Sequence, residues 1–344
     1  MDTNQYLELF DDLDNNNQTE NFIQKNKRPQ RFPERHFKHA RARNAEFLKG
    51  QDDSSRSFKY TYKPARFEEW WLLESIGNFY EAKLISDVLR RLKGGKEASV
   101  YLCRGTESTD SLVTAKVYRL RSLRSLKNDS IYRTGRIDLG DDGKKLFKEA
   151  DVKAIMQRSA YGEELRHTSW IAYEFNTLEM LHADGADVPK PFGMEKNAIL
   201  MEYIGDEGNA APTLNAVTLA RDEARELFDR VIHNIDLLLT SKRIHADLSA
   251  YNILYWDGDI TLIDFPQVVD PEANPSAWVI FLRDVTRVCQ YFRSQGVKCD
   301  ARKLATELWT SHGYKVVQEV HPSQLDAEKK EDRRLWEKQK SSAK

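Results

Sequence analysis

The residues best suited to chemistry lie in one short stretch, IHADLSAYNILYWDGDITLIDFPQ, at 244–267. It places the carboxylates of Asp247 and Asp264 and the amide of Asn252 among short apolar runs. An ionised carboxylate in an apolar setting is costly unless a cation or a strong donor meets it. Carboxylate and amide oxygens suit a hard cation such as Mg²⁺. The stretch therefore predicts a magnesium site at Asn252 and Asp264, with Asp247 placed to orient an acceptor group or take its proton. We interpret His245 as a structural histidine that supports this loop.

Earlier segments supply the other parts that phosphoryl transfer requires. In LKGGKEASVY, Gly94 and Gly95 let the backbone approach phosphate oxygens without an intervening Cβ. Lys116 in TAKVY is a lone cation in an apolar strand, and taken by itself it is expected to snorkel to the surface. With Glu174 as a partner, Lys116 becomes a candidate ligand of the α- and β-phosphates of ATP. Because phosphoryl transfer depends mainly on positioning and charge neutralisation, the ordered set predicts an enzyme that uses ATP and Mg²⁺.

The elements that must position these residues form two groups along the chain. The first reads as an antiparallel sheet that opens with a tight hairpin, and the second is mostly helical. A helix rich in aromatic residues is expected to precede the sheet, with Gly77 as a point where it breaks and its aromatic stripe as a packing face. Strands are predicted at 86–92, 98–104, 112–120, 188–194, 197–205, 252–256 and 260–264, and helices at 167–185, 218–243, 275–296 and 301–313.

Composition excludes several classes of protein but selects no partner. The chain has 344 residues, 40% of them hydrophobic and 31% charged, with a formal net charge of -1. Its three cysteines, Cys103, Cys289 and Cys299, lack metal-ligand spacing and fit a reducing compartment. The polar N-terminus does not resemble a signal peptide, and no apolar run is long enough to cross a membrane. We expect a cytoplasmic protein without membrane contact.

Charged segments flank and interrupt the predicted core. Residues 1–63 read as a disordered, solvated arm, although the basic stretch 25–43 interleaves aromatic residues and could contact RNA. The arginines that follow Lys116 leave the same choice between a solvated face and RNA. A flexible insertion is expected at about 120–168, and a charged tail at 321–344.

These motifs together resemble the RIO family of atypical protein kinases over about 84–295. The resemblance rests on GGKEASVY, AKVY, WIAYEFNTL, ILMEYIG, HADLSAYN and IDFPQ, with NPSAWVIFLRDVTRV and YRTGR as further matches. It implies an α+β, bilobal protein-kinase-like fold. A helical lead-in at 64–86 would precede an N-terminal lobe at 87–205, built from an antiparallel sheet and a glutamate helix. A reduced, mostly helical C-terminal lobe would follow at 206–320.

The resemblance also implies an activity and a set of site residues. The activity is transfer of the ATP γ-phosphate to protein serine or threonine, including autophosphorylation, or to water as an ATPase switch in ribosome-related work. Asp247 would be the catalytic aspartate, Lys116 and Glu174 the ion pair, and Asn252 with Asp264 the metal ligands. Asp264 would also be a possible phosphate acceptor. The implied nucleotide-binding residues are Gly94, Gly95, Lys96, Glu97, Ala98, Ser99, Val100, Lys116, Met201, Glu202 and Ile204.

The sequence departs from ordinary protein kinases and leaves alternatives open. Ala246 and Pro266 stand where those kinases have arginine and glycine, and the segment after Asp264 is too short for the usual peptide-binding helices. One alternative is a small-molecule phosphotransferase of the aminoglycoside or choline type, which shares the H-x-D-x-x-x-x-N loop. The other is a non-catalytic scaffold that binds ATP. The protein substrate does not follow from the sequence.

Overall fold

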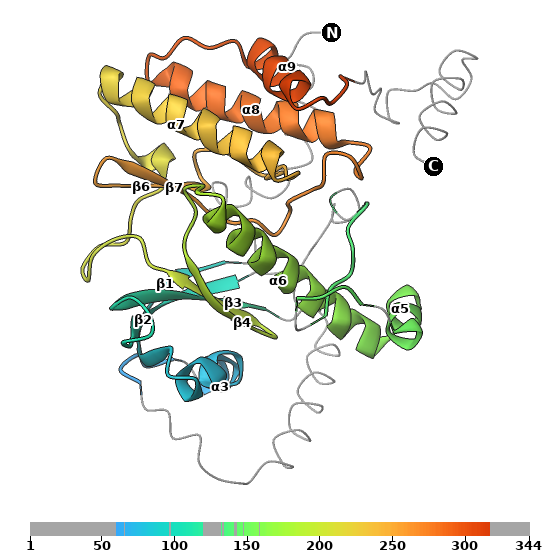
Figure 1. Cartoon of the computed structure of the whole chain (residues 1–344). Coiled ribbons are helices and arrows are strands. Elements are labelled where there is room, and N and C mark those ends of the chain that lie inside the picture. The colour runs from blue at the N-terminus through green and yellow to red at the C-terminus, as the bar shows by residue number, and fades with distance from the viewer. Residues whose placement is uncertain are drawn as a thin grey trace, which may run out of the picture. The chain divides into compact units, whose positions relative to one another are not determined.

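The computed structural model describes residues 60–316, apart from 65, 96–97, 120–131, 133, 141–142, 147 and 158. These residues belong to one compact unit at 58–344. Figure 1 shows a layer of strands with α3 on one side, and α7, α8 and α9 grouped beyond the other side. The predicted basic stretch 25–43 and the tail 321–344 lie outside the described residues.

The sheet has five antiparallel strands in the order β1-β2-β3-β5-β4. The β1–β2 pairing is the tight hairpin that the sequence predicts, and it closes at Gly94 opposite Ser99. In β3, Val113, Ala115 and Val117 are buried in alternation, as expected for a strand with one face in the core. The strands are β1 (Ile85–Gly94), β2 (Ala98–Gly105), β3 (Leu112–Tyr118), β4 (Pro191–Glu195) and β5 (Ala198–Glu202).

The helix α3 (Arg66–Glu81) covers one face of the sheet with Leu72, Ile76 and Phe79. Each of these side chains is almost completely buried, and burial of one such side chain stabilises the fold by about 1.5–3 kcal/mol. The predicted break at Gly77 is wrong, because the helix continues through it. A glycine inside a helix costs about 1 kcal/mol, which is less than the burial of its neighbours contributes.

The insertion after β3 contains more helix than the sequence suggests. α5 (Glu149–Met156) lies within it, and α6 (Ala160–Ala183) begins before the predicted start at His167. Ser159 caps α6, because its side-chain oxygen accepts a hydrogen bond from the Gly162 amide at 3.0 Å. The polar first turns of α6 give no apolar periodicity, which is why the sequence pattern starts too late.

The second group of elements is mostly helical, as expected. It consists of η3 (Leu214–Ala216), α7 (Arg221–Thr240), the hairpin β6 (Ile253–Trp256) and β7 (Asp259–Leu262), α8 (Ala277–Ser294) and α9 (Ala301–Ser311). α7 buries Leu227, Val231, Ile235 and Leu238 along one face of the helix. None of the described helices has the length and apolar character needed to span a bilayer.

One polar network ties the connection after α6 to the helical group. Arg230 of α7 forms two bonds with the Asp187 carboxylate, at 2.7 and 2.8 Å, and Asn234 donates to the same carboxylate at 2.7 Å. The Asp187 carbonyl accepts a bond from the Leu262 amide at 2.7 Å. Burial raises the pKa of Asp187, but the bonds from Arg230 and Asn234 prevail and hold this pKa below its usual range. The network therefore fixes the hairpin β6–β7, which leads directly into Asp264.

Candidate active site

The loop 244–252, here called the aspartate loop, turns sharply at Ala246. Ala246 is fully buried and has a φ of 65°, in the left-handed region that costs a non-glycine residue about 1–2 kcal/mol. Its amide donates to the Asp284 carboxylate at 2.8 Å, and its carbonyl accepts a bond from Arg283. These two α8 side chains hold the turn. The next residue, Asp247, consequently leaves the core, and its side chain is 40% exposed.

The two carboxylate oxygens of Asp247 have different partners. Oδ2 accepts a hydrogen bond from Asn252 Nδ2 at 3.1 Å, and the same amide donates to the Asp247 carbonyl at 2.9 Å. Oδ1 lies 3.2 Å from Nη1 of Arg287, which reaches it from α8. Although part of its side chain is exposed, removal of the carboxylate from water raises the pKa of Asp247 to about 6, against the opposing charges of Arg283 and Arg287. The sequence pattern does not predict this role for Arg287.

Asp264 follows β7 and also takes a strained backbone conformation, with a φ of 73°. The hairpin is joined to the aspartate loop here, because the Ile263 amide donates to the Asn252 carbonyl at 3.0 Å. His245 Nε2 lies 3.1 Å from the Ile263 carbonyl oxygen, and the centroid of its ring lies 4.7 Å from that of the Phe265 ring. His245 thus has the structural role expected of it. The hydrogen bond from Ile263 to Asn252 places Asn252 beside the residue that precedes Asp264.

Lys116 joins three elements at one point. Its Nζ lies 2.7 Å from Glu174 Oε1 of α6 and 2.6 Å from Asp264 Oδ1. The Lys116 side chain is 13% exposed, so it does not snorkel to the surface. Burial lowers the pKa of Lys116, but the charges of Asp264 and Glu174 raise it well above its usual range. For Asp264, burial raises the pKa, but Lys116 prevails and lowers it.

Tyr118 is a second site residue whose role the sequence pattern does not predict, although it lies within AKVY. Its hydroxyl donates to Oε2 of Glu174, so Glu174 is held by Lys116 on one oxygen and by Tyr118 on the other. The tyrosine is fully buried, and its ring makes an edge contact with Trp170 at a centroid distance of 5.1 Å. Burial and then the charge of Glu174 raise the pKa of Tyr118 well above its usual range, which keeps its hydroxyl protonated.

The glycine loop, residues 94–100, joins β1 to β2, the strand that pairs with the Lys116 strand β3. The Gly95 amide donates to the Ala98 carbonyl at 2.8 Å, and a Cβ on Gly95 would lie 2.9 Å from that carbonyl oxygen. This close approach requires glycine. Val100 pairs directly with Lys116 across β2 and β3, and Ser99 is its neighbour toward the loop. Lys96 and Glu97 lie outside the described residues.

The other strand beside Lys116 leads to the predicted adenine segment. β5 pairs with β3, and it ends with Met201 and Glu202 opposite Thr114 and Val113. Beyond it, the Ile204 carbonyl accepts a bond from the Ala211 amide at 3.0 Å. The two strands that flank β3 therefore carry Ala98, Ser99 and Val100 on β2, and Met201 and Glu202 on β5.

Within the YRTGR segment of the insertion, the described residues Tyr132 and Arg136 contact the loop that carries Asp264 and the α8 side chain behind it. Arg136 donates to the carbonyls of Pro266 and Val268 at 2.7 and 2.6 Å, and its guanidinium lies over the Tyr173 ring. The Tyr132 hydroxyl accepts a bond from Arg283 at 2.9 Å. This segment therefore supports the Asp264 loop and the α8 side chain behind the aspartate loop.

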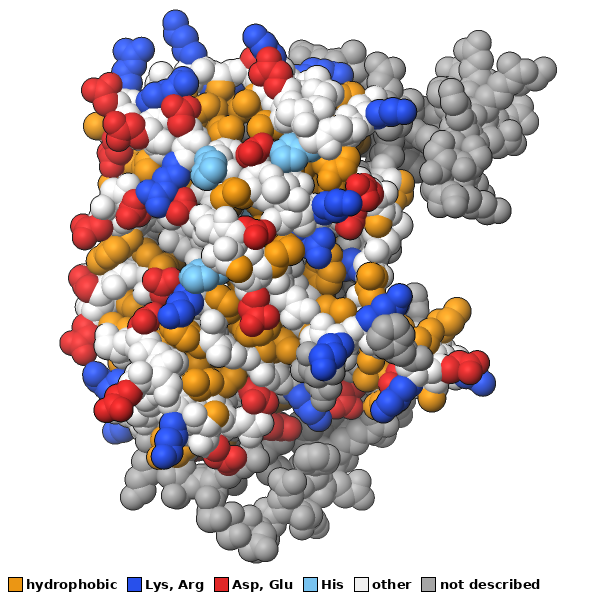
Figure 2. Space-filling model, viewed as in Figure 1, with side chains coloured by type: hydrophobic (Ala, Val, Ile, Leu, Met, Phe, Trp, Pro, Cys, Tyr) orange, Lys and Arg blue, Asp and Glu red, His pale blue; other side chains and the backbone are white. Residues whose placement is uncertain are grey.

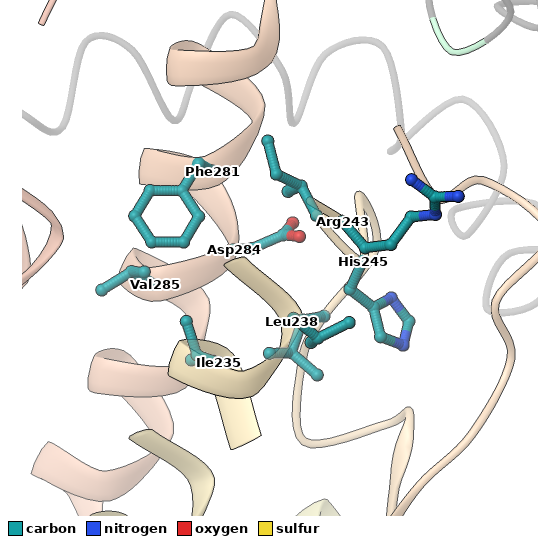
Figure 3. A pocket seen from close by; sticks show the side chains of 9 residues that line it. Ile235, Leu238, Arg243, His245, Phe281, Asp284 and Val285 are labelled. Atoms are coloured by element: carbon teal, nitrogen blue, oxygen red, sulfur yellow. The ribbon is translucent and has the colours of Figure 1, made fainter. Parts of the chain in front are cut away.

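A small cavity lies behind the aspartate loop, between α7 and α8. The space open to the centre of a water molecule measures ≈ 10 Å³, which is about enough for one water. Figure 3 shows Ile235 and Leu238 from α7 and Phe281 from α8 around it, with Asp284 pointing toward the segment that carries His245. The cavity is a packing gap and has no room for a nucleotide.

Comparisons with known proteins agree on one family. A family model described as the RIO domain matches residues 100–304. Serine/threonine-protein kinase RIO1 of Caenorhabditis elegans is 28% identical over 204 residues, which cover 59% of this chain and 36% of that protein. RIO-type serine/threonine-protein kinase Rio1 of Thermoplasma acidophilum is 33% identical over 171 residues, which cover 46% of this chain and 89% of that protein.

A solved structure has the same fold. It is the Rio2 kinase-ADP/Mg²⁺-phosphoaspartate complex from Chaetomium thermophilum, with a TM-score of 0.50 and 19% identity over 88% of this chain and 86% of that one. This similarity confirms the predicted α+β, bilobal protein-kinase-like fold, with its antiparallel sheet in one lobe and its helices in the other. The chain spans only about a third of the length of the C. elegans relative.

Proposed function

Because the chain belongs to the RIO domain family, we propose that it transfers the γ-phosphate of ATP to protein serine or threonine, itself included, or to water as an ATPase switch. The observation that carries this proposal is the meeting of Lys116, Glu174 and Asp264, which come from β3, α6 and the end of β7. The relatives are named as serine/threonine-protein kinases, which favours a protein acceptor over a small molecule.

Lys116 is proposed to hold the α- and β-phosphates. The carboxylates of Glu174 and Asp264 keep it protonated, so it presents a permanent positive charge in the space between β3 and the Asp264 loop. Glu174 is buried and is fixed on its second oxygen by Tyr118. Lys116 can therefore keep its contact with Glu174 when phosphate oxygens replace Asp264 as its second partner.

Asn252 and Asp264 fit a divalent cation of the magnesium type. Asn252 uses its amide nitrogen to bind Asp247, which leaves its side-chain oxygen as the atom that can face a cation. Asp264 is 43% exposed, and Lys116 contacts its Oδ1. Oxygen donors from one carboxylate and one amide suit Mg²⁺, which usually shares its coordination with phosphates and water. When bound, Mg²⁺ would neutralise phosphate charge during transfer.

Asp247 is proposed to orient the acceptor hydroxyl or water. Its carboxylate is held by Asn252 and Arg287 and is more exposed than the residues on either side of it. The glycine loop, with Gly94, Gly95 and residues 96–100, is proposed to cover the phosphates. The backbone of Met201, Glu202 and Ile204 is proposed to take the adenine.

The first test is turnover of γ-labelled ATP by the purified full chain with Mg²⁺. Label is followed on the chain, on a generic protein substrate and as free phosphate, beside Asp247→Asn and Lys116→Met. Asp257→Asn is the matched control, because Asp257 lies exposed at the turn between β6 and β7. We expect turnover in the wild type and the control only. Equal turnover in Asp247→Asn would contradict the proposed site.

The labelled products distinguish a protein kinase from an ATPase and from an ATP-binding scaffold. Predominant free phosphate identifies an ATPase, whereas label on serine or threonine identifies a kinase. Label that hydroxylamine removes identifies an acyl phosphate, and formation of a hydroxamate at Asp264 would place the phosphate on that carboxylate. Absence of turnover while ATP still binds would contradict an enzyme and favour the scaffold.

Contact with RNA or a ribosomal particle is the remaining part of the proposal, and it rests on the basic stretch 25–43. Figure 2 shows acidic and basic side chains interspersed over the described face that it presents. Because the lysines and arginines of the basic stretch would neutralise RNA phosphates, deletion of residues 1–57 should weaken RNA binding and reduce its salt dependence. Unchanged affinity would end the RNA proposal.

The free thiols Cys103, Cys289 and Cys299 support a reducing, cytoplasmic location.

A further inference from the structure

Arg287 lies within the matched segment NPSAWVIFLRDVTRV, but the match gives it no role in the proposed site. It lies on α8, one helical turn beyond Arg283, and its Nη1 is 3.2 Å from Oδ1 of Asp247. The Arg287 side chain is only 17% exposed. An arginine that is largely buried against a carboxylate is better fixed than one in a surface ion pair, because fewer water molecules compete for it.

The contact completes a clamp on the Asp247 carboxylate. The terminal torsion of an aspartate is soft, so a single hydrogen bond leaves its carboxylate plane free to rotate. Here Asn252, five residues from Asp247, binds Oδ2, and Arg287, forty residues away, binds Oδ1. Two partners on two oxygens fix the plane. Arg287 therefore determines the direction in which Oδ1 presents its remaining lone pair to an acceptor.

The helix that carries Arg287 is itself attached to the aspartate loop. Arg283 and Asp284 bind the Ala246 carbonyl and amide one turn earlier on α8. The same helix buries Val285, Val288 and Phe292 in the core, each at most 1% exposed. α8 thus cannot shift relative to Asp247 without breaking these bonds, which makes the Arg287 guanidinium a fixed reference point for the carboxylate.

Charge supports the same role. The γ-phosphate of ATP must approach an acceptor that lies against the anionic Asp247, and like charges repel. The guanidinium of Arg287 offsets this repulsion at the carboxylate.

We infer that Arg287 is a positioning residue for the proposed phosphoryl transfer, acting through Asp247. This inference rests on the proposed function. Since Arg287 contacts Asp247 and not Lys116, its removal should lower kcat and leave the KM for ATP unchanged. Misplacement of a catalytic group by about 1 Å costs about 100-fold in rate, so we expect kcat to fall about 10- to 100-fold.

The experiment compares Arg287→Met, Arg287→Lys and Arg287→Ala in the full chain. Arg293→Met is the matched control, because Arg293 is an exposed arginine on the same helix. A positioning role predicts a lower kcat in Arg287→Met with unchanged KM and unchanged urea midpoint. It also predicts partial recovery in Arg287→Lys and recovery of Arg287→Ala by added methylguanidine. A kcat within twofold of that of Arg293→Met would overturn the inference, as would a loss that accompanies unfolding and that methylguanidine does not reverse.

A second measurement separates this inference from the proposed function. Crystal structures of the wild type and Arg287→Met would show whether the Asp247 carboxylate plane rotates when its Oδ1 partner is removed. An unchanged plane would overturn the positioning role even in a protein that turns over ATP. A rotated plane in a protein without turnover would retain Arg287 as the clamp and reject the reaction.

Discussion

Removal of the Asp284 carboxylate should destabilise the protein more than most single substitutions. Asp284 is 3% exposed and bonds to two buried groups, the Ala246 amide at 2.8 Å and the Arg283 guanidinium at 3.3 Å. In Asp284→Ala, Arg283 remains as a buried cation without its carboxylate, a loss that typically costs about 3–5 kcal/mol. The unsatisfied Ala246 amide alone would cost about 1–3 kcal/mol.

The two costs overlap, because Arg283 keeps its bonds to the Tyr132 hydroxyl and the Ala246 carbonyl. We therefore expect the free energy of unfolding to fall by about 3–5 kcal/mol in total. Many domains have a stability of about 5–15 kcal/mol, so the variant should still fold. Asp284→Asn retains an oxygen for the Ala246 amide and should lose less.

Urea unfolding followed by tryptophan fluorescence measures these differences. The decisive comparison is the double variant Arg283→Met/Asp284→Ala, which removes the buried cation together with its partner. It should be more stable than Asp284→Ala alone, because no unpaired charge remains. A loss below about 1 kcal/mol in Asp284→Ala, or strictly additive losses in the double variant, would refute the buried-pair reasoning.

Three further outcomes follow from the same contacts. Tyr118→Phe should lower the free energy of unfolding by about 1.5–3 kcal/mol and weaken ATP binding, because Glu174 loses its second partner; urea titration and calorimetry measure the two effects. Asp187 has a lowered pKa, so its stabilisation is present above the unfolded-state pKa of about 4 and is lost as the pH falls through the folded-state value. The urea midpoint should therefore fall more steeply below about pH 4 in the wild type than in Asp187→Asn. Gly205→Ala should cost about 1–3 kcal/mol and weaken ATP binding, because Gly205 has a φ of 138° directly after the proposed adenine segment.

Each of these outcomes has a control. Tyr80→Phe is the control for Tyr118→Phe, because Tyr80 is an exposed tyrosine, and an equal effect of both would reject the role of the buried hydroxyl. Parallel pH curves for the wild type and Asp187→Asn would show that the network around Asp187 adds no pH dependence. Gly258→Ala tests the backbone argument at the turn between β6 and β7, where φ is 85° and a Cβ meets nothing within 4 Å. It should lose stability without losing ATP affinity.

The sequence predicts local features of this fold well where one pattern dominates. The hairpin around Gly95 combines strand alternation with a glycine that the close approach of Ala98 requires, so pattern and geometry agree. The break predicted at Gly77 is wrong because helix propensity is weaker than burial of α3 against the sheet. The early start of α6 depends on one cap, Ser159, which hydrophobic periodicity does not register.

Some site residues can likewise be predicted from the sequence, whereas the roles of others depend on how distant elements pack. The aspartate loop and the residue pair Lys116 and Glu174 lie in recognisable motifs, so they can be predicted together. Arg287 lies 40 residues from Asp247 and Tyr118 lies 56 from Glu174; both fall within matched segments, NPSAWVIFLRDVTRV and AKVY, yet neither segment indicates which partner the side chain meets. The left-handed conformation of Ala246 has no glycine to signal it. Such features follow from how distant elements pack.

The bonds behind Ala246 have a consequence for protein engineering. HADLSAYN looks like a portable cassette, yet the bend that exposes its aspartate depends on Arg283 and Asp284, which are encoded more than thirty residues later. A transplant of the loop alone into another scaffold would carry the aspartate without the groups that enforce the bend, and Ala246 would relax to an ordinary backbone conformation. The smallest transferable unit is therefore the loop together with the first half of α8.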